Sequence, residues 1–130
     1  MTSHLRDPAT VLVVDDNSLL KRAAVQIVED NGYLALSADN AGEAMTILDT
    51  HDEVDVLFTD VDMPGSMDGL ELAQETSVSY PMVEIVVTSS AEQTADQLPV
   101  GAVYLPKPYS SDEVAEALRD KIDPARPFVC

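Results

Sequence analysis

Short apolar runs alternate along the chain with segments in which apolar residues recur every three or four positions. The runs have the length and β-branched content of buried strands, whereas the periodic segments have the pattern of amphipathic helices. The runs predict strands at residues 10–14, 33–38, 54–59, 83–87 and 102–105. The periodic segments predict helices at about residues 18–30, 41–51, 69–78, 91–98 and 112–121. This alternation predicts a doubly wound α/β domain, because the crossover between two parallel strands passes over a face of the sheet.

Polar residues at the helix boundaries support these predictions. Asn17 or Ser18 can cap the first helix, Asn40 can cap the second, and Ser110 or Ser111 can cap the last. Such side chains accept hydrogen bonds from N–H groups of the first turn that have no partner within the helix. The pattern therefore indicates where these helices begin as well as which face of each is buried.

The chain has 130 residues, of which 45% are hydrophobic, and this suits one domain with its own core. We expect this domain at residues 9–121, between a flexible N-terminal segment at 1–8 and a C-terminal tail at 122–130.

No apolar run reaches the roughly 20 residues that a membrane-spanning helix needs, so we expect no insertion into a membrane. The single cysteine, Cys130, has no partner for an intramolecular disulfide. We therefore expect a cytoplasmic location.

Charge narrows the range of partners. Seven Lys and Arg residues against 24 Asp and Glu residues give a formal net charge of −17. A surface with this charge repels the phosphate backbones of nucleic acids and the headgroups of anionic lipids. We therefore expect no direct binding to nucleic acid.

Polar side chains stand where four of the predicted strands end. Asp15 and Asp16 follow the first strand, Asp60 the third, Thr88 the fourth, and Lys107 the fifth after one proline. The carboxyl ends of parallel strands meet at one edge of the sheet, where doubly wound domains bind their ligands. One such residue alone is often a helix cap or a solvated side chain. Caps and solvated side chains rarely account for polar residues at four different strand ends at once, so we expect these side chains to form a site.

The expected cluster favours a particular chemistry. Carboxylates that lie close together repel one another and raise each other's pKa unless a cation lies between them. Their hard oxygen atoms suit Mg²⁺, with Mn²⁺ as the alternative. A metal ion, a lysine ammonium and a threonine hydroxyl can together bind the oxygens of a phosphoryl group. Since a carboxylate can also be the nucleophile toward phosphorus, the cluster indicates phosphoryl chemistry.

Four segments carry a more specific signal. They are VLVVDDNS at 11–18, VDVLFTDVDMPGSMDGLEL at 54–72, EIVVTSS at 84–90 and AVYLPKPYS at 102–110. Together they resemble the receiver domain of response regulators, the phosphoacceptor partners of sensor histidine kinases in bacterial two-component signalling. The match covers about residues 9–121. The resemblance implies the flavodoxin-like fold, a parallel sheet in the order 2-1-3-4-5, which this family exemplifies. Because the sequence shows no second module, we expect a stand-alone receiver; a fragment of a longer protein is the alternative.

The resemblance also implies a role for each residue of the expected cluster. Asp60 would accept a phosphoryl group from a sensor histidine kinase or a histidine phosphotransfer protein. Asp16 would bind Mg²⁺ directly and Asp15 through water. Asp60 and the backbone carbonyl of Asp62 would complete the metal site, and Lys107 would pair with the phosphoryl group. Such a domain is not a classical enzyme, because it assists its own phosphorylation and hydrolysis and is consumed as the acceptor.

A switch is implied as well. Thr88 would hydrogen-bond the phosphoryl group, and Tyr104 would turn inward when Thr88 moves; the alternative for Tyr104 is an ordinary half-buried strand residue. The surface of the fourth helix, fifth strand and fifth helix would then alter its contact with a downstream protein target, or the phosphoryl group would pass onward in a phosphorelay. A dimer on phosphorylation is a further expectation. Lys107 and Pro108 match the family's Lys-Pro pair, often a cis peptide, and the sequence leaves the isomer open.

Two features depart from the commonest family pattern. Gly65-Ser66-Met67 makes the loop after the third strand one residue longer, which predicts a different turn into the third helix. Asp62 adds an acidic side chain that could hydrogen-bond the water attacking the phosphoryl group, or repel both. We therefore expect Asp62→Asn to change the rate of dephosphorylation by more than about threefold.

Two other functions stay open at this stage. One is a phosphatase of the haloacid dehalogenase type, because Asp60 and Asp62 after an apolar strand resemble its nucleophile and general acid. That family, however, has its acidic pair after the lysine, whereas Asp15 and Asp16 come first here, and its substrate cap needs a longer chain. The other is a binding module of the same fold that is never phosphorylated. Loss of a site residue would indicate it, and none is lost.

Overall fold

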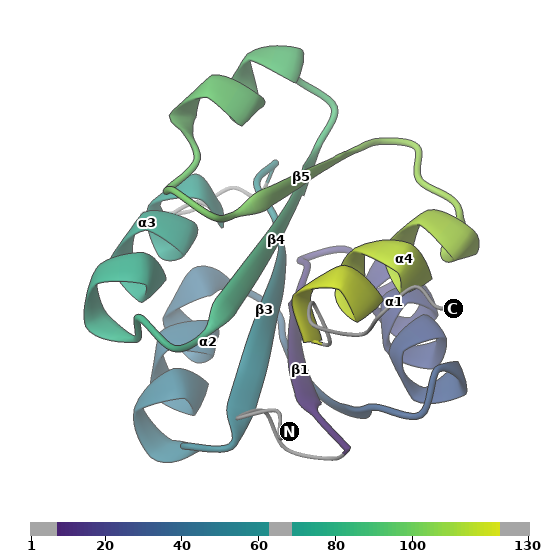
Figure 1. The fold of residues 1–130 in the computed structure, drawn as a ribbon, viewed down its shortest axis with the longest axis horizontal. Coiled ribbons are helices and arrows are strands. Elements are labelled where there is room, and N and C mark those ends of the chain that lie inside the picture. Colours follow the sequence, from purple (N-terminus) through teal and green to yellow (C-terminus); the bar gives the residue numbers. More distant parts are fainter. Residues whose placement is uncertain (1–7, 63–68, 123–130) are drawn as a thin grey trace.

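The computed structural model describes residues 8–62 and 69–122 of the chain. Its five strands form one parallel sheet in the order β2-β1-β3-β4-β5, drawn as arrows in Figure 1. The strands are β1 (Thr10–Val14), β2 (Leu34–Ala38), β3 (Val54–Asp60), β4 (Glu84–Ser89) and β5 (Val103–Pro106). The doubly wound fold and the strand order expected from the sequence are confirmed.

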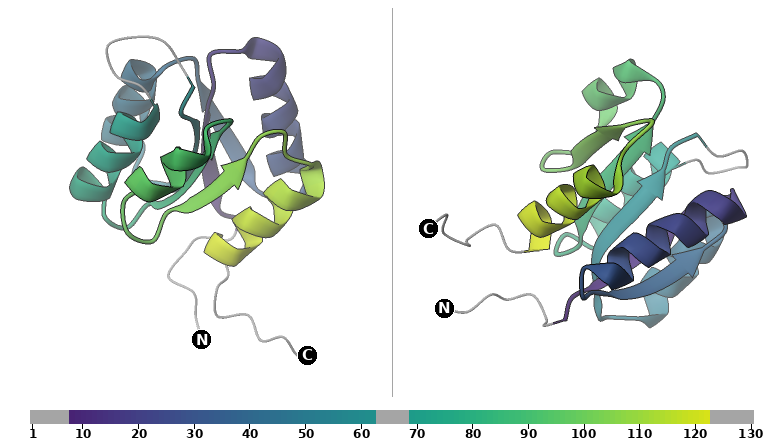
Figure 2. Two further views of the ribbon diagram at one scale, coloured as in Figure 1. Left: turned by 90° about the horizontal axis from the view of Figure 1, so that it is seen from above. Right: turned by 90° about the vertical axis from the view of Figure 1, so that its right-hand side faces the viewer.

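Four α-helices and one 3-10 helix lie between and after these strands in the described residues. They are α1 (Ser18–Asp30), α2 (Ala41–Thr50), α3 (Gly69–Ser79), η1 (Glu92–Gln97) and α4 (Ser111–Ile122). Helices α1 and α4 cover one face of the sheet, and α2 and α3 cover the other, as the views in Figures 1 and 2 show. The sheet is therefore the middle layer of three.

The hydrophobic core lies on both faces of the sheet. All five residues of β1 are buried, because β1 is an inner strand with helices on either side. Val11 and Val13 pack in the cluster under α1 and α4, whereas Leu12 and Val14 pack in the cluster under α2. Since a slip of one residue would turn each of these side chains to the wrong face, this burial specifies the register of β1 in the sheet and so holds Asp15 at its edge.

Side-chain caps begin the helices where the sequence predicts them. Asn17, rather than Ser18, caps α1 by accepting from two N–H groups of its first turn at 3.0 Å, and Asn40 caps α2. At α4, the Ser110 hydroxyl accepts from the Glu113 N–H at 3.1 Å, and the Glu113 carboxylate accepts from the Ser110 N–H at 2.8 Å. This reciprocal pair is a capping box.

The short helix expected at residues 91–98 is present, but it is not an α-helix. The segment forms the six-residue 3-10 helix η1. Ala91 precedes it and has no side chain that can cap, and the Leu98 backbone is held out of the helical region by the proline that follows. A segment bounded in this way is too short for a stable α-helix.

Other boundaries shift by one or two residues. β3 and β4 run further than predicted, so that Asp60 and Thr88 are themselves strand residues. β5 extends to Pro106, whose missing N–H is tolerated because β5 lies at the sheet edge. Helix α4 includes Ile122, whose side chain is buried in the core.

The expectations for residues 1–7, for Gly65-Ser66-Met67 and for residues 123–130 lie outside the part of the chain that the structure describes. Within the described ranges, none of the helices combines the length and the apolar content needed to cross a membrane.

Candidate functional site

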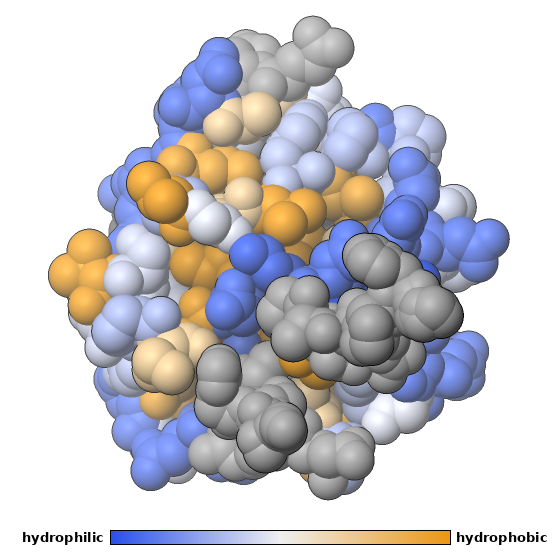
Figure 3. All heavy atoms as spheres, viewed as in Figure 1, coloured by the Kyte–Doolittle hydropathy of each residue, from blue (hydrophilic) through white to orange (hydrophobic). Residues whose placement is uncertain are grey.

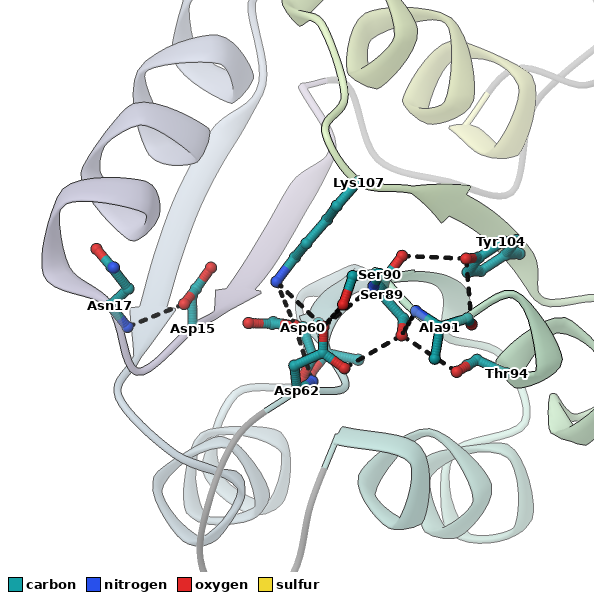
Figure 4. Close-up of polar contacts among 11 residues, drawn as sticks. Asp15, Asn17, Asp60, Asp62, Ser89, Ser90, Ala91, Thr94, Tyr104 and Lys107 are labelled. Carbon is teal, nitrogen blue, oxygen red and sulfur yellow. Dashed lines mark hydrogen bonds and ion pairs between the residues drawn. The ribbon is translucent and has the colours of Figure 1, made fainter.

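The side chains expected to cluster meet at the carboxyl edge of the sheet (Figure 4). Asp60 ends β3 and pairs in register with Thr88 of β4. The N–H of Lys107 donates to the carbonyl of Ser89 at 3.1 Å, so Lys107 stays beside β4 after β5 has ended. The N–H of Asp15 donates to the last carbonyl of β2 at 3.2 Å. The backbone bonds between strands thus hold these residues at the edge.

Three carboxylates form the acidic part of the site. One oxygen from each of Asp15, Asp16 and Asp60 lies within 4.8 Å of the others. Asp15 and Asp60 are buried, whereas Asp16 is exposed. Burial raises the pKa of Asp15, and the charges of Asp60 and Asp16 raise it further, against an opposing hydrogen bond from the Asn17 N–H and the charge of Lys107. Hard oxygens from three side chains, one of them open to solvent, fit a divalent cation that keeps water ligands.

Lys107 brings positive charge to the same place. Its Nζ donates to Asp60 Oδ1 at 2.8 Å and lies 3.6 Å from Asp62 Oδ2. Burial lowers the pKa of the Lys107 ammonium, but its hydrogen bond to Asp60 and the charges of Asp60, Asp62 and Asp15 outweigh burial and raise it. Lys107 is therefore a cation at any pH near neutrality.

Thr88 supplies a free donor. Its hydroxyl is buried and has no hydrogen-bond partner among the described residues. Buried hydroxyls are rarely left without a partner, and this one stands on β4 directly opposite Asp60. A group attached to Asp60 that carries an acceptor oxygen could give this hydroxyl its missing bond.

The side chain of Asp62 does not point at the acidic cluster. Its carboxylate accepts three hydrogen bonds, from the Ser89 hydroxyl and from the N–H and hydroxyl of Ser90, each at 3.1 Å. Burial opposes ionisation of Asp62, but the bonds from Ser90 and Ser89 and the charge of Lys107 lower its pKa. The backbone N–H of Asp62 donates to Asp60 Oδ1 at 2.9 Å. Its effect on dephosphorylation stays a prediction.

Tyr104 is half-buried on β5 and contacts the loop after β4. Its hydroxyl donates to the carbonyl of Ser89 at 3.0 Å and lies 3.3 Å from that of Ala91. Tyr104 thus touches the segment that directly follows Thr88, as the proposed pairing of the two residues requires. The rearrangement of Tyr104 on phosphorylation stays a prediction.

Two further features bear on the site. The peptide between Lys107 and Pro108 is cis. At the start of α3, a Cβ on Gly69 would lie 2.0 Å from the carbonyl oxygen of Asp60. No side chain fits there, so glycine allows α3 to begin against the backbone of Asp60.

Sequence reasoning missed the partners of Asp62. It did not connect Ser89 or Ser90 with Asp62, although three successive hydroxyl residues, Thr88 to Ser90, were a signal for a polar loop. It also missed a cavity of about 400 Å³ beside the site, lined by Leu20, Ser90, Lys107, Pro108 and Tyr109. This cavity joins residues of α1 to the loop after β5, and sequence spacing alone does not show such a neighbourhood.

Comparison with known proteins agrees with this geometry. The family model described as the response regulator receiver domain matches residues 11–119. The chain is 36% identical over 121 residues to the positive alginate biosynthesis regulatory protein of Pseudomonas aeruginosa, covering 89% of this chain and 48% of that protein. It is 31% identical over 124 residues to the sensor kinase CckA of Brucella abortus, covering 92% of this chain and 13% of that protein. The chain thus spans less than half the length of these two relatives.

Solved structures show the same fold. A response regulator receiver domain protein from Clostridium thermocellum has a TM-score of 0.81 at 24% identity, with 89% of this chain and 95% of that chain covered. The receiver domain from the hybrid histidine kinase CckA has a TM-score of 0.75 at 26% identity, with 88% and 99% covered.

Proposed function

The chain belongs to the response regulator receiver domain family, and on this premise we propose that Asp60 accepts a phosphoryl group from the phosphohistidine of a sensor histidine kinase or a histidine phosphotransfer protein. Receiver domains are signalling domains that interact with histidine kinases, rather than classical enzymes. One observation carries the proposal: buried Asp60 is hydrogen-bonded to Lys107 and pairs in register with Thr88 of β4, whose buried hydroxyl has no hydrogen-bond partner among the described residues.

The proposed transfer is a displacement at phosphorus. A carboxylate oxygen of Asp60 attacks in line with the leaving nitrogen, and the new O–P bond gives an acyl phosphate. The P–N bond breaks with its electron pair on the imidazole nitrogen, which takes a proton from solvent. Lys107 would pair with one phosphoryl oxygen, and Thr88 would donate to another. Positive charge and donors already in place lower the energy of the transition state, because its charge is spread over these oxygens.

A divalent cation belongs to the same proposal. Asp15, Asp16 and Asp60, with the backbone carbonyl of Asp62, would hold Mg²⁺, or Mn²⁺ in its place. The ion would supply positive charge to the oxygens of the carboxylate and the phosphoryl group. Three carboxylates lie close together, and among the described residues Lys107 is the one cation that forms an ion pair with any of them, through Asp60; this excess of negative charge supports the proposed metal.

A protein donor would dock beside the site. Leu19 and Leu20 on the first turns of α1 are 74% and 43% exposed. Leu20 also lines the cavity that includes Lys107. A helix presenting a phosphohistidine could bury an apolar side chain in this cavity while its phosphoryl group reaches Asp60. Since such a kinase draws its phosphoryl group from ATP, we place the reaction in the cytoplasm.

The signal would pass to a downstream protein through the surface formed by η1, β5 and α4. Figure 3 shows hydrophobic residues at the surface over the β5 side of the sheet. Tyr104 lies on this strand and contacts the loop before η1. A shift of Thr88 toward the phosphoryl group would free space for Tyr104 to move inward, altering the surface for a downstream protein or for a dimer. Onward transfer to a second histidine protein is the other outcome.

The proposal is tested by the intact mass of the full chain after incubation with acetyl phosphate and MgCl₂. We expect a gain of one phosphoryl group, lost in Asp60→Asn and lost when EDTA removes the metal. Asp49→Asn, which changes an exposed aspartate on α2, is the matched control and should gain the group. Phosphorylation of Asp60→Asn, or no gain by the wild type together with no binding of beryllofluoride, would contradict the proposal. Release of many equivalents of phosphate from small phosphomonoesters would favour a phosphatase instead.

A further inference from the structure

The carboxylate of Asp62 links two loops that are far apart in the sequence. Its Oδ1 accepts from the Ser89 hydroxyl, and its Oδ2 accepts from the N–H and hydroxyl of Ser90 (Figure 4). The Ser89 oxygen in turn accepts from the Ala91 N–H at 3.0 Å and from the Thr94 hydroxyl at 3.1 Å. Asp62 thus ties the end of β3 to the loop after β4 and to η1.

The other side of the same loop is held by Tyr104. Its hydroxyl contacts the carbonyls of Ser89 and Ala91. The segment Ser89–Ala91 follows Thr88 directly and lies between the Asp62 carboxylate and the Tyr104 hydroxyl (Figure 4). A change in the contacts of Asp62 can therefore reach Thr88 and Tyr104 through this short stretch of backbone.

Asp62 also shares the cation of the site. Its Oδ2 lies 3.6 Å from Lys107 Nζ, which is hydrogen-bonded to Asp60. Phosphorylation of Asp60 would replace its single carboxylate charge with a phosphoryl charge of about −1.5 to −2 and bring three acceptor oxygens beside Lys107. Two anions would then compete for one ammonium, and they would repel each other in a partly buried site where salt screens them weakly.

We propose that Asp62 is a positioning residue that latches the Ser89–Ala91 segment in the unphosphorylated protein and competes with the phosphoryl group for Lys107. The inference rests on the proposed function of Asp60. Coupling between two equilibria is reciprocal. If the phosphoryl group weakens the contacts of Asp62 with the Ser89–Ala91 segment by some factor, these contacts must weaken the binding of the phosphoryl group by the same factor.

Two variants of the full chain test the latch, with beryllofluoride in MgCl₂ as a noncovalent stand-in for the phosphoryl group. Asp62→Asn keeps the shape of the side chain and removes its charge. Ser90→Ala removes one donor to Asp62 and leaves the Asp62 charge in place. We expect both variants to bind beryllofluoride more tightly than wild type, by about threefold or more. Without beryllofluoride, both should shift the NMR amide signals of Ala91 and Thr94.

Ser79→Ala is the matched control. It removes a 2.7 Å bond between a serine hydroxyl and the carboxylate of Glu75, at the far end of α3, and should change neither affinity nor these signals. Tighter binding by Asp62→Asn but not by Ser90→Ala would overturn the latch, because the charge of Asp62 alone would then explain the effect. Unchanged binding by both variants, beside normal binding by the wild type, would also overturn it and leave the proposed function intact. No binding by the wild type would instead remove the proposed function.

Discussion

Thr88 holds a buried hydroxyl that has no hydrogen-bond partner among the described residues. An unsatisfied buried donor costs about 1 to 3 kcal/mol of folding free energy. The unmodified protein therefore carries a small destabilisation at the position where a phosphoryl oxygen would arrive. On the proposed function, a phosphoryl oxygen on Asp60 would accept a hydrogen bond from this hydroxyl and so remove this cost in folding free energy.

We expect Thr88→Val to separate these two effects. The variant keeps the shape of the side chain and removes the unsatisfied hydroxyl, so the free protein should gain about 1 kcal/mol of stability. Beryllofluoride should raise its melting temperature less than it raises that of wild type. Thr76→Val is the control, because Thr76 on α3 is another buried hydroxyl without a described partner; it should leave the beryllofluoride effect unchanged. An equal response of Thr88→Val and wild type would argue against a direct contact.

Tyr109 makes stability depend on pH in the alkaline range. Its ring packs edge-on against Phe58, with centroids 5.9 Å apart. Burial, and after it the charge of Asp15, raise the pKa of the Tyr109 phenol above its usual value of 10.0. Folding thus favours the protonated phenol. Its contribution to stability is complete below the unfolded pKa and declines as pH rises from that value to the folded pKa.

We therefore expect wild type to lose stability relative to Tyr109→Phe as the pH rises above about 10. Denaturant unfolding of both proteins at about pH 8 and about pH 11 measures the change. A difference in unfolding free energy that stays constant between these two values would contradict the stated shift.

The charged part of the site could be predicted from the sequence, and its hydrogen-bond network could not. Asp15, Asp60 and Lys107 follow buried apolar runs, and parallel strands bring such ends to one edge regardless of detail. The bonds between Asp62 and Ser90 depend on how two loops fold toward each other. Loop conformation has no periodic pattern in the sequence, so the direction of these side chains became visible only in the structure.

The secondary-structure elements also differ in how well the sequence predicts them. β1 and β3 are predicted well, because all their residues are buried and most of them are apolar. The position of η1 is predicted but its 3-10 geometry is not, because Ala91 to Leu98 contains apolar residues at helical spacing but lacks a cap and is followed by proline. Backbone constraints at its ends outweighed the periodic pattern.

The cap of α4 gives a prediction for one element. Ser110→Ala removes the side-chain half of the capping box with Glu113 and should destabilise the protein by about 1 kcal/mol. Ser111→Ala changes the exposed first residue of the same helix and should cost less. Urea unfolding of the two variants measures the difference. Equal costs would mean that the capping box contributes nothing in solution.

The charge of the whole molecule should make its stability depend on salt. A net charge of −17 on 130 residues repels itself more strongly in the compact state than in the unfolded chain. We expect the melting temperature to rise by about 4 °C or more between low salt and about 0.2 M NaCl, the range in which screening develops. Sucrose of equal osmolality is the control and should produce a smaller rise. A melting temperature independent of NaCl would show that the acidic residues do not destabilise the fold.

The residues of the site lie far apart in the sequence, so they leave the ribosome at different times. Asp15 is made first, Asp60 follows, and Lys107 is made last of the three. Asp60 acquires the Lys107 ammonium when β5 has added to the edge of the sheet beside β4. Domains generally fold as units once their chain is available. On the proposed function, a nascent or truncated chain that ends before β5 would carry Asp60 without the Lys107 ammonium, and we expect it to accept no phosphoryl group from the kinase.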